Sequence, residues 1–318
     1  MNRSDATLLM RLAVPGSVGP GTLPPEVEEP PRRAAALERL LVRADRFEPP
    51  DDWRRAAFAL IAAEGEPWPG VAPAACHRRL GAIEGGAVFL ATPVAYVATL
   101  TRLHLSPEGP VALTAQEAAA LAADHAAAFG GSPGLRAAAD GTLFCVFDRA
   151  IEAETLDPAE FPGGEAGSRQ PSGRDAARLR AAMSEIEMWL HEHRFNRARR
   201  ARGARELGGL WLWGGGAPLE RAPRIEGWSG GEDPLLGAPG AVERFADAGS
   251  GAVRIAATPG APSWREAESR WLEPALAALA AERLARIEIL AGARAFRVER
   301  AQRLRLWRRA RPWWELLA

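Results

Sequence analysis

Lysine is absent from this sequence, and all 40 basic residues of the 318-residue chain are arginine. The 40 acidic residues balance them, so the formal net charge is zero and overall charge predicts no partner. Alanine, glycine and proline are also abundant, and a GC-rich genome explains this bias more simply than selection for bidentate arginine chemistry. Arginine content by itself is therefore weak support for phosphate binding.

Thiols and long apolar runs are scarce as well. The two cysteines, Cys76 and Cys145, are far apart in the sequence, which excludes a disulfide scaffold and a zinc-knuckle spacing. No apolar stretch approaches the roughly 20 residues that are needed to cross a bilayer. The short apolar run at residues 8–14 contains Arg11 and predicts a first β-strand, not a signal peptide. We therefore expect a cytoplasmic protein without a membrane partner.

The rest of the composition, 47% hydrophobic and 25% charged residues, is typical of a globular protein that can bury a sizeable core. Strand-like and helix-like segments alternate, which predicts an α/β fold with a mostly parallel sheet covered by helices. Asp51 and Asp52 are good N-terminal residues for one helix, and Thr114 with Glu117 predicts a capping box at another. Residues 210–213 are apolar on both faces, as expected for an interior parallel strand.

The composition changes between residues 157 and 173, where DPAEFPGGEAGSRQPSG is rich in proline, glycine and polar residues. A segment with so little to bury predicts a linker. We therefore expect an N-terminal α/β region at residues 1–156 and a C-terminal α/β region at residues 174–318. No internal repeat lies on either side.

Residues 183–216 hold the densest cluster of polar side chains that could perform chemistry. An amphipathic helix carries His191 and His193 into an arginine-rich turn, which leads to an apolar strand. Residues two apart on a helix point in different directions, so these histidines cannot bind one metal ion from a regular helix. We interpret His191 as a helix-end residue, whereas His193 could end the helix or contact a ligand.

Arginines crowd the turn that follows this helix, and three glycines follow the strand. Guanidinium groups could hold a phosphate or carboxylate, or they could form a solvated basic segment balanced by neighbouring glutamates. The amides of Gly214, Gly215 and Gly216 could cradle an anion, although a tight turn also explains them. Neither a lysine nor a Ser/Thr follows, so the glycines are not a nucleotide P-loop. The arginines of the turn are Arg194, Arg197, Arg199, Arg200, Arg202 and Arg205.

The C-terminal segment interleaves arginines with tryptophans. Such a pattern can bind single-stranded nucleic acid through charge and stacking. Leucines in the same segment equally predict that it packs its tryptophans onto the protein. The residues concerned are Arg303, Arg305, Arg308, Arg309, Arg311, Trp307, Trp313 and Trp314.

The order His193, Asn196, Arg199 and Gly203, followed by LWLWGGG at residues 210–216, forms a recognisable pattern. With it, the chain resembles the cofactor-independent phosphoglycerate mutase family of the archaeal type. It looks closest to a shorter bacterial branch described as RpfE-type regulatory proteins. The resemblance covers most of the chain, and the central motif is its specific part. Further support comes from LATPV at Leu90 to Val94 and from the closing RLWRR.

This resemblance implies a fold like that of the alkaline phosphatases, with a serine nucleophile and two metal ions held by aspartates and histidines. The first metal aspartate would follow the first strand, where this chain has Pro15, Gly16 and Ser17. The chain departs from the family pattern at Arg194, Glu206 and Gly208, and its five histidines do not supply a second metal shell. Asp124-His125, the one adjacent pair, lies in an alanine-rich helix and is expected to face solvent. The resemblance therefore implies a remnant of this fold without the dimetal site, with Mn or Mg needed only for mutase activity.

We predict a mutase-like, catalytically degenerate protein that binds a small phosphorylated or carboxylated metabolite. An isomerase of the phosphoglycerate mutase type and a non-catalytic regulatory or interaction protein both remain open, and nucleic-acid binding is favoured least. No catalytic residue or metal ligand is assigned, and the oligomeric state stays open. The predicted ligand-binding residues are His193, Asn196, Arg199, Gly214, Gly215 and Gly216.

Overall fold

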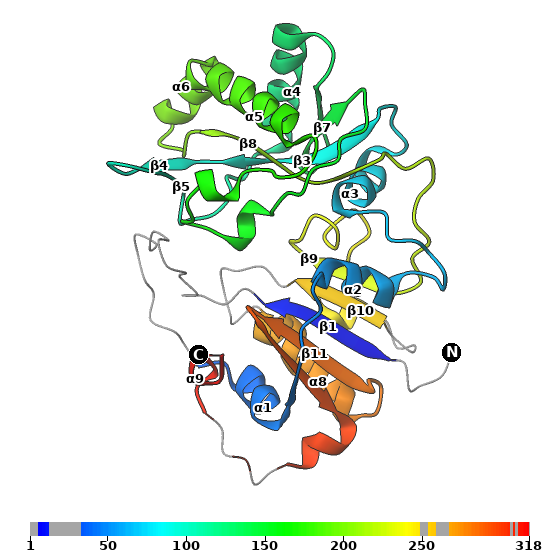
Figure 1. The fold of residues 1–318 in the computed structure, drawn as a ribbon. Helices are drawn as coiled ribbons and strands as arrows, with labels where there is room; N and C mark the ends of the chain where they lie inside the picture. The colour runs from blue at the N-terminus through cyan, green and yellow to red at the C-terminus, as the bar shows by residue number, and fades with distance from the viewer. Residues whose placement is uncertain are drawn as a thin grey trace. The chain divides into compact units, whose positions relative to one another are not determined.

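The computed structural model describes residues 6–12, 33–248, 254–258, 267–305, 308 and 311–317 (Figure 1). They divide into two compact units. The first unit takes its described residues from 6–12, 33–68 and the part of the chain from residue 223 onwards, and the second is Pro69–Ala222. None of the described helices combines the length and the apolar character that a membrane span requires.

The first unit is built on a six-stranded sheet in the order β2-β12-β11-β1-β10-β9. Strand β1 is parallel to β10 and β11, and β10 is parallel to β9, whereas β12 and β2 are antiparallel additions at one end. A mostly parallel sheet with helices is therefore confirmed for this unit. The strands are β1 (Thr7–Leu12), β2 (Asp45–Phe47), β9 (Trp228–Gly231), β10 (Arg254–Thr258), β11 (Arg286–Ala291) and β12 (Arg294–Glu299).

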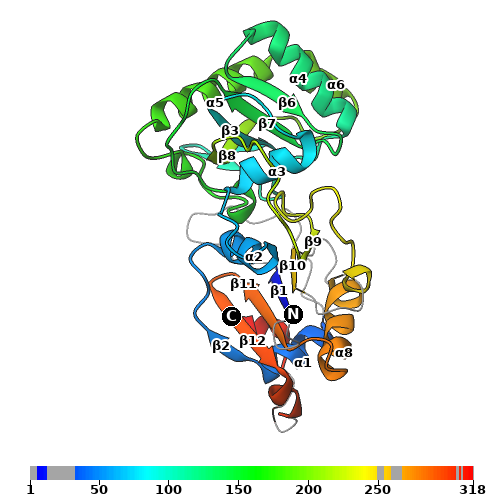
Figure 2. The same cartoon turned by 90° about the vertical axis from the view of Figure 1, so that its right-hand side faces the viewer.

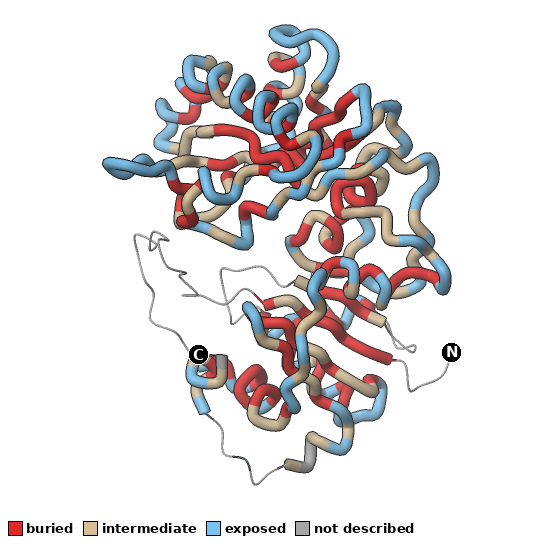
Figure 3. Tube along the Cα trace, in the orientation of Figure 1, coloured by how far each residue is buried: buried red, intermediate tan, exposed pale blue. Residues whose placement is uncertain are grey.

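Alternation of side chains along these strands gives the sheet two different faces. Leu8 and Met10 of β1 belong to the main core of this unit, together with apolar residues of α1 (Ala35–Arg43) and α8 (Glu273–Ala280). Helix α2 (Trp53–Ile61) contacts β10 and begins at Asp52, whose carboxylate accepts bonds from two backbone amides, as predicted. The strands are largely buried (Figure 3). The shorter helical segments of this unit are η4 (Phe245–Ala248), the π-helical η5 (Glu268–Leu272), η6 (Arg300–Leu304) and α9 (Trp313–Leu317).

The C-terminal segment docks on the first unit. Arg305 pairs with Asp45 at 2.5 Å, Arg308 donates to the Val42 and Ala44 carbonyls, and the Trp313 side chain is buried. These contacts agree with the prediction that this segment packs onto the protein. Trp307 and Arg309 lie outside the described residues.

The second unit contains a four-stranded sheet in the order β6-β7-β3-β8, with every neighbouring pair antiparallel. A separate hairpin is formed by two short strands, β4 and β5. Helices α4, α5 and α6 lie on one face of the larger sheet, with α3 on the other (Figures 1 and 2). The elements are α3 (Val71–Leu80), β3 (Ala87–Val94), β4 (Tyr96–Ala98), β5 (Leu103–Leu105), α4 (Ala115–Phe129), β6 (Gly134–Ala137), β7 (Leu143–Phe147), η2 (Pro158–Glu160), η3 (Gly167–Arg169), α5 (Ala176–His191), α6 (Arg194–Ala201) and β8 (Gly209–Gly216).

Strand β8 corrects one expectation from the sequence. It is the end strand of its sheet and runs antiparallel to β3, so the prediction of an interior parallel strand was wrong. Its apolar residues are buried on both faces because α3 and α5 both contact the strand. Two-sided burial therefore comes from the covering helices and not from a parallel neighbour.

The segment at residues 157–173 lies inside the second unit, so the structure divides the chain elsewhere than at the expected linker. Its backbone groups bond to the hairpin, with the Leu105 amide donating to the Gly164 carbonyl and the Ala166 amide to the Leu103 carbonyl. Just before it, Glu154 forms an antiparallel bridge with Ser172. Proline and glycine here shape a packed loop, because backbone hydrogen bonds replace the missing apolar side chains.

Candidate functional site

His193 connects two helices. It is the N-cap of α6, where its Nδ1 accepts a 3.2 Å hydrogen bond from the Phe195 amide. The ring lies on Trp189, with centroids 4.4 Å apart, and Nε2 is 3.5 Å from the Asp124 carboxylate. Burial lowers the pKa of His193, and the nearby Asp124 carboxylate opposes this shift. The neutral ring thus serves as a cap at this position.

Asn196 fastens α5 to the segment that leads into β8. Its side-chain nitrogen donates to the Leu190 carbonyl at 3.0 Å and to the Leu207 carbonyl at 2.8 Å. Its side-chain oxygen accepts a 2.9 Å bond from the Leu207 amide. The side chain is buried, and these three bonds use most of what an amide can donate and accept.

Arg199 is also held from within the chain. Its Nη1 lies 2.6 Å from the Glu117 carboxylate, and its Nε donates to the Arg205 carbonyl at 2.6 Å. Glu117 completes the predicted capping box with Thr114 and also pairs with Arg202 at 2.9 Å. The motif of His193, Asn196 and Arg199 therefore fixes the course of the chain between α4, α5 and β8.

The three glycines lie inside β8, where they let neighbouring groups approach. A Cβ on Gly215 would lie 2.1 Å from the Phe89 ring, and one on Gly214 would lie 3.1 Å from the Val71 side chain. The Gly214 amide already donates to the Thr155 hydroxyl at 3.0 Å. Gly214, Gly215 and Gly216 do not line the pocket described next, so the structure does not bring them together with Asn196 there.

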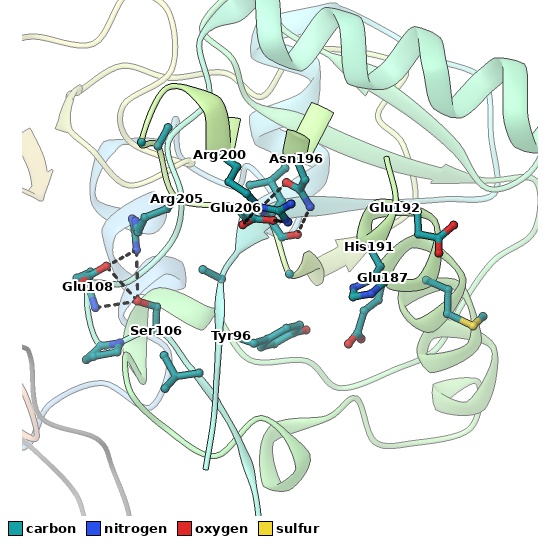
Figure 4. Close-up of a pocket in the computed structure, with 18 of the residues that line it drawn as sticks. Tyr96, Ser106, Glu108, Glu187, His191, Glu192, Asn196, Arg200, Arg205 and Glu206 are labelled. Atoms are coloured by element: carbon teal, nitrogen blue, oxygen red, sulfur yellow. Dashed lines mark hydrogen bonds and ion pairs between the residues drawn. The ribbon is translucent and has the colours of Figure 1, made fainter. Parts of the chain in front are cut away.

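A pocket of about 1240 Å³ opens in the second unit (Figure 4). Three separate segments form it: the last turns of α5, helix α6 with the loop that leads to β8, and the β4–β5 hairpin with the turn after it. Asn196 is the one residue of the predicted set that lines it. The lining is Ala95, Tyr96, Val97, Ser106, Pro107, Glu108, Ser184, Glu187, Met188, His191, Glu192, Asn196, Arg200 and residues 203–208.

One face of α5 borders this pocket. Glu187 and Met188 each lie three or four residues from Ser184 and from His191, a spacing that places these residues along one side of a helix. The core face of the same helix carries different residues, such as Leu190. His191 is the last residue of α5, the helix-end position that the sequence predicted, and it also lines the pocket. His193 instead precedes the first turn of α6 as its N-cap. Reading the polar face of this helix could have found the lining.

Tyr96 is the only tyrosine of the chain, and its ring lies within the pocket (Figure 4). A Cβ on Gly208 would lie 2.4 Å from the ring carbon Cδ2, and one on Gly209 would lie 3.2 Å from the hydroxyl. Burial, and to a lesser extent the Glu187 carboxylate, raise the pKa of Tyr96, so it remains a neutral phenol. Sequence reasoning missed this residue because its neighbours in the pocket come from distant segments.

Charged groups of both signs line the pocket. Arg200 pairs with Glu206 through bonds of 2.8 and 2.5 Å, and Arg205 lies 3.2 Å from Glu108. Glu187 has no hydrogen-bond or ion-pair partner among the described residues, and burial raises its pKa. The pocket can therefore offer paired guanidinium groups and an unpaired carboxyl group to a polar ligand.

Metal ligation finds no support in the described residues, among which no group of three or more His, Cys, Asp or Glu side chains could hold an ion. Pro15, Gly16 and Ser17, where the family resemblance would place the first metal ligand, lie outside the described residues. The expectation that His125 faces solvent was wrong, because its ring is buried between Phe129 and Trp189.

The solved structures that are similar to this chain include a cofactor-independent phosphoglycerate mutase from Thermoplasma acidophilum and the PH0037 protein from Pyrococcus horikoshii. Both are 13% identical to this chain over 92% of its length, cover 88% and 87% of their own chains, and give TM-scores of 0.34 and 0.42. No family model matches the chain, and no curated protein matches it. Similarity this low assigns neither an activity nor a ligand.

Proposed function

We propose that this protein binds a small phosphorylated or carboxylated metabolite in the pocket of the second unit, as a non-catalytic member of the phosphoglycerate mutase-like proteins that its sequence resembles. The observation that carries the proposal is the pocket itself, in which polar side chains from three segments converge. Its volume of about 1240 Å³ is ample for a small metabolite, since ligand sites commonly measure ~300–1,000 Å³.

The acid group of the ligand would bind at Arg200. This guanidinium uses Nε and Nη2 to pair with Glu206, which leaves Nη1 for a ligand, and its side chain is 64% exposed. An exposed ion pair contributes little to stability, so an incoming carboxylate or phosphate can share the arginine at small cost. Asn196 and Arg199 act here as positioning residues, because they bond to Leu207 and Arg205 and so hold the loop after α6 against the helix that carries Arg200.

The binding proposal is tested by thermal unfolding with 3-phosphoglycerate. A ligand that binds only the folded state raises the melting temperature progressively with concentration. Arg200→Ala should remove most of the shift, and the matched control is Arg178→Ala, which breaks an exposed pair with Asp148 outside the pocket. No shift at millimolar ligand, or an equal loss in both variants, would refute the proposal.

A second function, isomerisation of a phosphorylated acid, is favoured by the motif that runs from His193 to Gly203 ahead of the apolar strand. It is tested by an assay for interconversion of 3- and 2-phosphoglycerate with Mn²⁺ or Mg²⁺. Turnover that a chelator abolishes would establish the isomerase and end the non-catalytic proposal. A melting shift without turnover would support the binding protein.

A further inference from the structure

We propose that the ligand of this pocket is a small zwitterion, with a protonated amine beside its acid group, and that Glu187 and Tyr96 recognise the amine. This inference rests on the proposed function, because it concerns the same pocket and adds a second group to the ligand. The inference is drawn from which charged groups around the pocket form ion pairs and which do not.

Carboxylates outnumber guanidinium groups in the lining. Both arginines already have a carboxylate partner, Arg200 in Glu206 and Arg205 in Glu108. The two remaining carboxylates, Glu187 and Glu192, form no ion pair or hydrogen bond with the described residues, and they belong to α5 and its C-cap. The pocket therefore keeps unneutralised acidic groups on the α5 side, which a simple anion would not complement.

The ion-paired arginines and the unpaired carboxyl group of Glu187 lie in different parts of the pocket. In Figure 4, Arg205 with Ser106 and Glu108 lies on one side, His191 with Glu187 on the other, and Tyr96 between them. Arg200 lies beside Glu206 above the tyrosine in the same view. A ligand that reaches across the pocket can thus contact an ion-paired guanidinium group with its acid group and the unpaired carboxyl group of Glu187 with another group.

Glu187 is suited to bind a cation because it is partly buried and unpaired. Removing a carboxylate from water without a partner is unfavourable, and burial accordingly raises the pKa of Glu187. An ammonium group would restore the missing interaction through a charge-assisted hydrogen bond. Occupation of the pocket by an amine would therefore favour the ionised form of Glu187.

Tyr96 supplies the second contact. Because Gly208 and Gly209 have no side chains, the ring of Tyr96 can pack directly against their backbone. An aromatic face attracts an ammonium group, and the phenol oxygen can accept a hydrogen bond from it. Tyr96 and Glu187 both line this pocket, and Figure 4 shows the tyrosine ring between Glu187 and Ser106.

The test compares two probes that differ only in the group at issue. O-Phosphoserine carries an amine where 3-phosphoglycerate carries a hydroxyl, and both keep the carboxylate and the phosphate. We expect the Kd for O-phosphoserine to be about tenfold lower than that for 3-phosphoglycerate. Calorimetric titration of the protein with each probe under the same conditions measures the two constants.

Variants identify the residues responsible. Glu187→Gln should abolish the preference while leaving the affinity for 3-phosphoglycerate within about twofold, and Tyr96→Leu should weaken the preference. Glu185→Gln is the matched control, since Glu185 is exposed on α5 outside the pocket and its loss should change nothing.

Equal affinity for the two probes, or a preference that survives in Glu187→Gln, would overturn this inference and leave the proposed function standing. Failure of both probes to bind would overturn the proposed function together with it.

Discussion

The ring of Tyr96 lies so close to Gly208 that a Cβ on this glycine would come within 2.4 Å of Cδ2. Gly208 is one of the positions where the chain departs from the phosphoglycerate mutase pattern. The contact couples the β4–β5 hairpin to the segment before β8, and it sets the position of the aromatic ring in the pocket. The absence of a side chain at Gly208 thus allows Tyr96, which is far away in the sequence, to lie against this segment.

Gly208→Ala should displace the Tyr96 ring. A methyl group in this space must push the ring outward, and overpacking of this kind costs about 1–3 kcal/mol of unfolding free energy. Because Tyr96 is the only tyrosine, absorbance titration of the phenol reports on it directly. Its pKa, raised by burial in the native protein, should move back toward the ordinary value in the variant.

Gly131→Ala provides the control for that experiment, because nothing lies within 4 Å of a Cβ at Gly131. An unchanged phenol titration in Gly208→Ala would show that the glycine does not position the tyrosine.

Asn196→Ala should destabilise the second unit by about 2–4 kcal/mol, since it leaves two buried carbonyls and one amide without their partner. Urea unfolding measures the loss. Arg197→Ala, an exposed neighbour on α6, should change stability by less than about 0.5 kcal/mol. Full stability of Asn196→Ala combined with loss of ligand binding would instead make Asn196 a ligand-binding residue.

Gly215→Ala should also destabilise the protein, by about 1–3 kcal/mol, because its Cβ would overlap the Phe89 ring. Phe89→Leu removes part of that ring, so the double variant should lose less stability than the two single variants added together. Such non-additivity, measured by chemical unfolding, would identify a packing role for the glycine. Strictly additive losses would argue against it.

His125 should make the protein less stable in mild acid. Its buried Nδ1 has no hydrogen-bond partner in the described structure, and burial lowers its pKa. A histidine with a lowered folded-state pKa binds its proton more readily in the unfolded chain, so stability falls as the pH drops below about 6.5. Asp124, His193 and Arg194 are the charged or titratable groups nearby, and the burial of His193 acts in the same direction.

Replacing His125 with phenylalanine keeps an aromatic ring between Phe129 and Trp189 and removes the titration. Unfolding free energies at about pH 7 and pH 5.5 should differ less in His125→Phe than in the parent protein. The same difference in both proteins would assign the acid sensitivity to other groups.

Local features could be predicted from the sequence because they depend on neighbouring residues. Asp52 caps α2, and Thr114 forms its box with Glu117, as their spacing predicts. The mostly parallel sheet of the first unit follows from alternating strands and helices. Side-chain bonds to the first helical turn and hydrophobic periodicity act over a few residues, so the order of residues alone determines them.

The pocket was decided only by tertiary structure. Whether His191 or His193 faces it depends on where α5 ends, and the antiparallel pairing of β8 depends on β3, more than a hundred residues earlier. Tyr96 and Glu187 are far apart in the sequence, and no local pattern predicts that they line the same pocket. Strand pairing and packing bring these segments together, and both depend on contacts between residues that are remote in sequence.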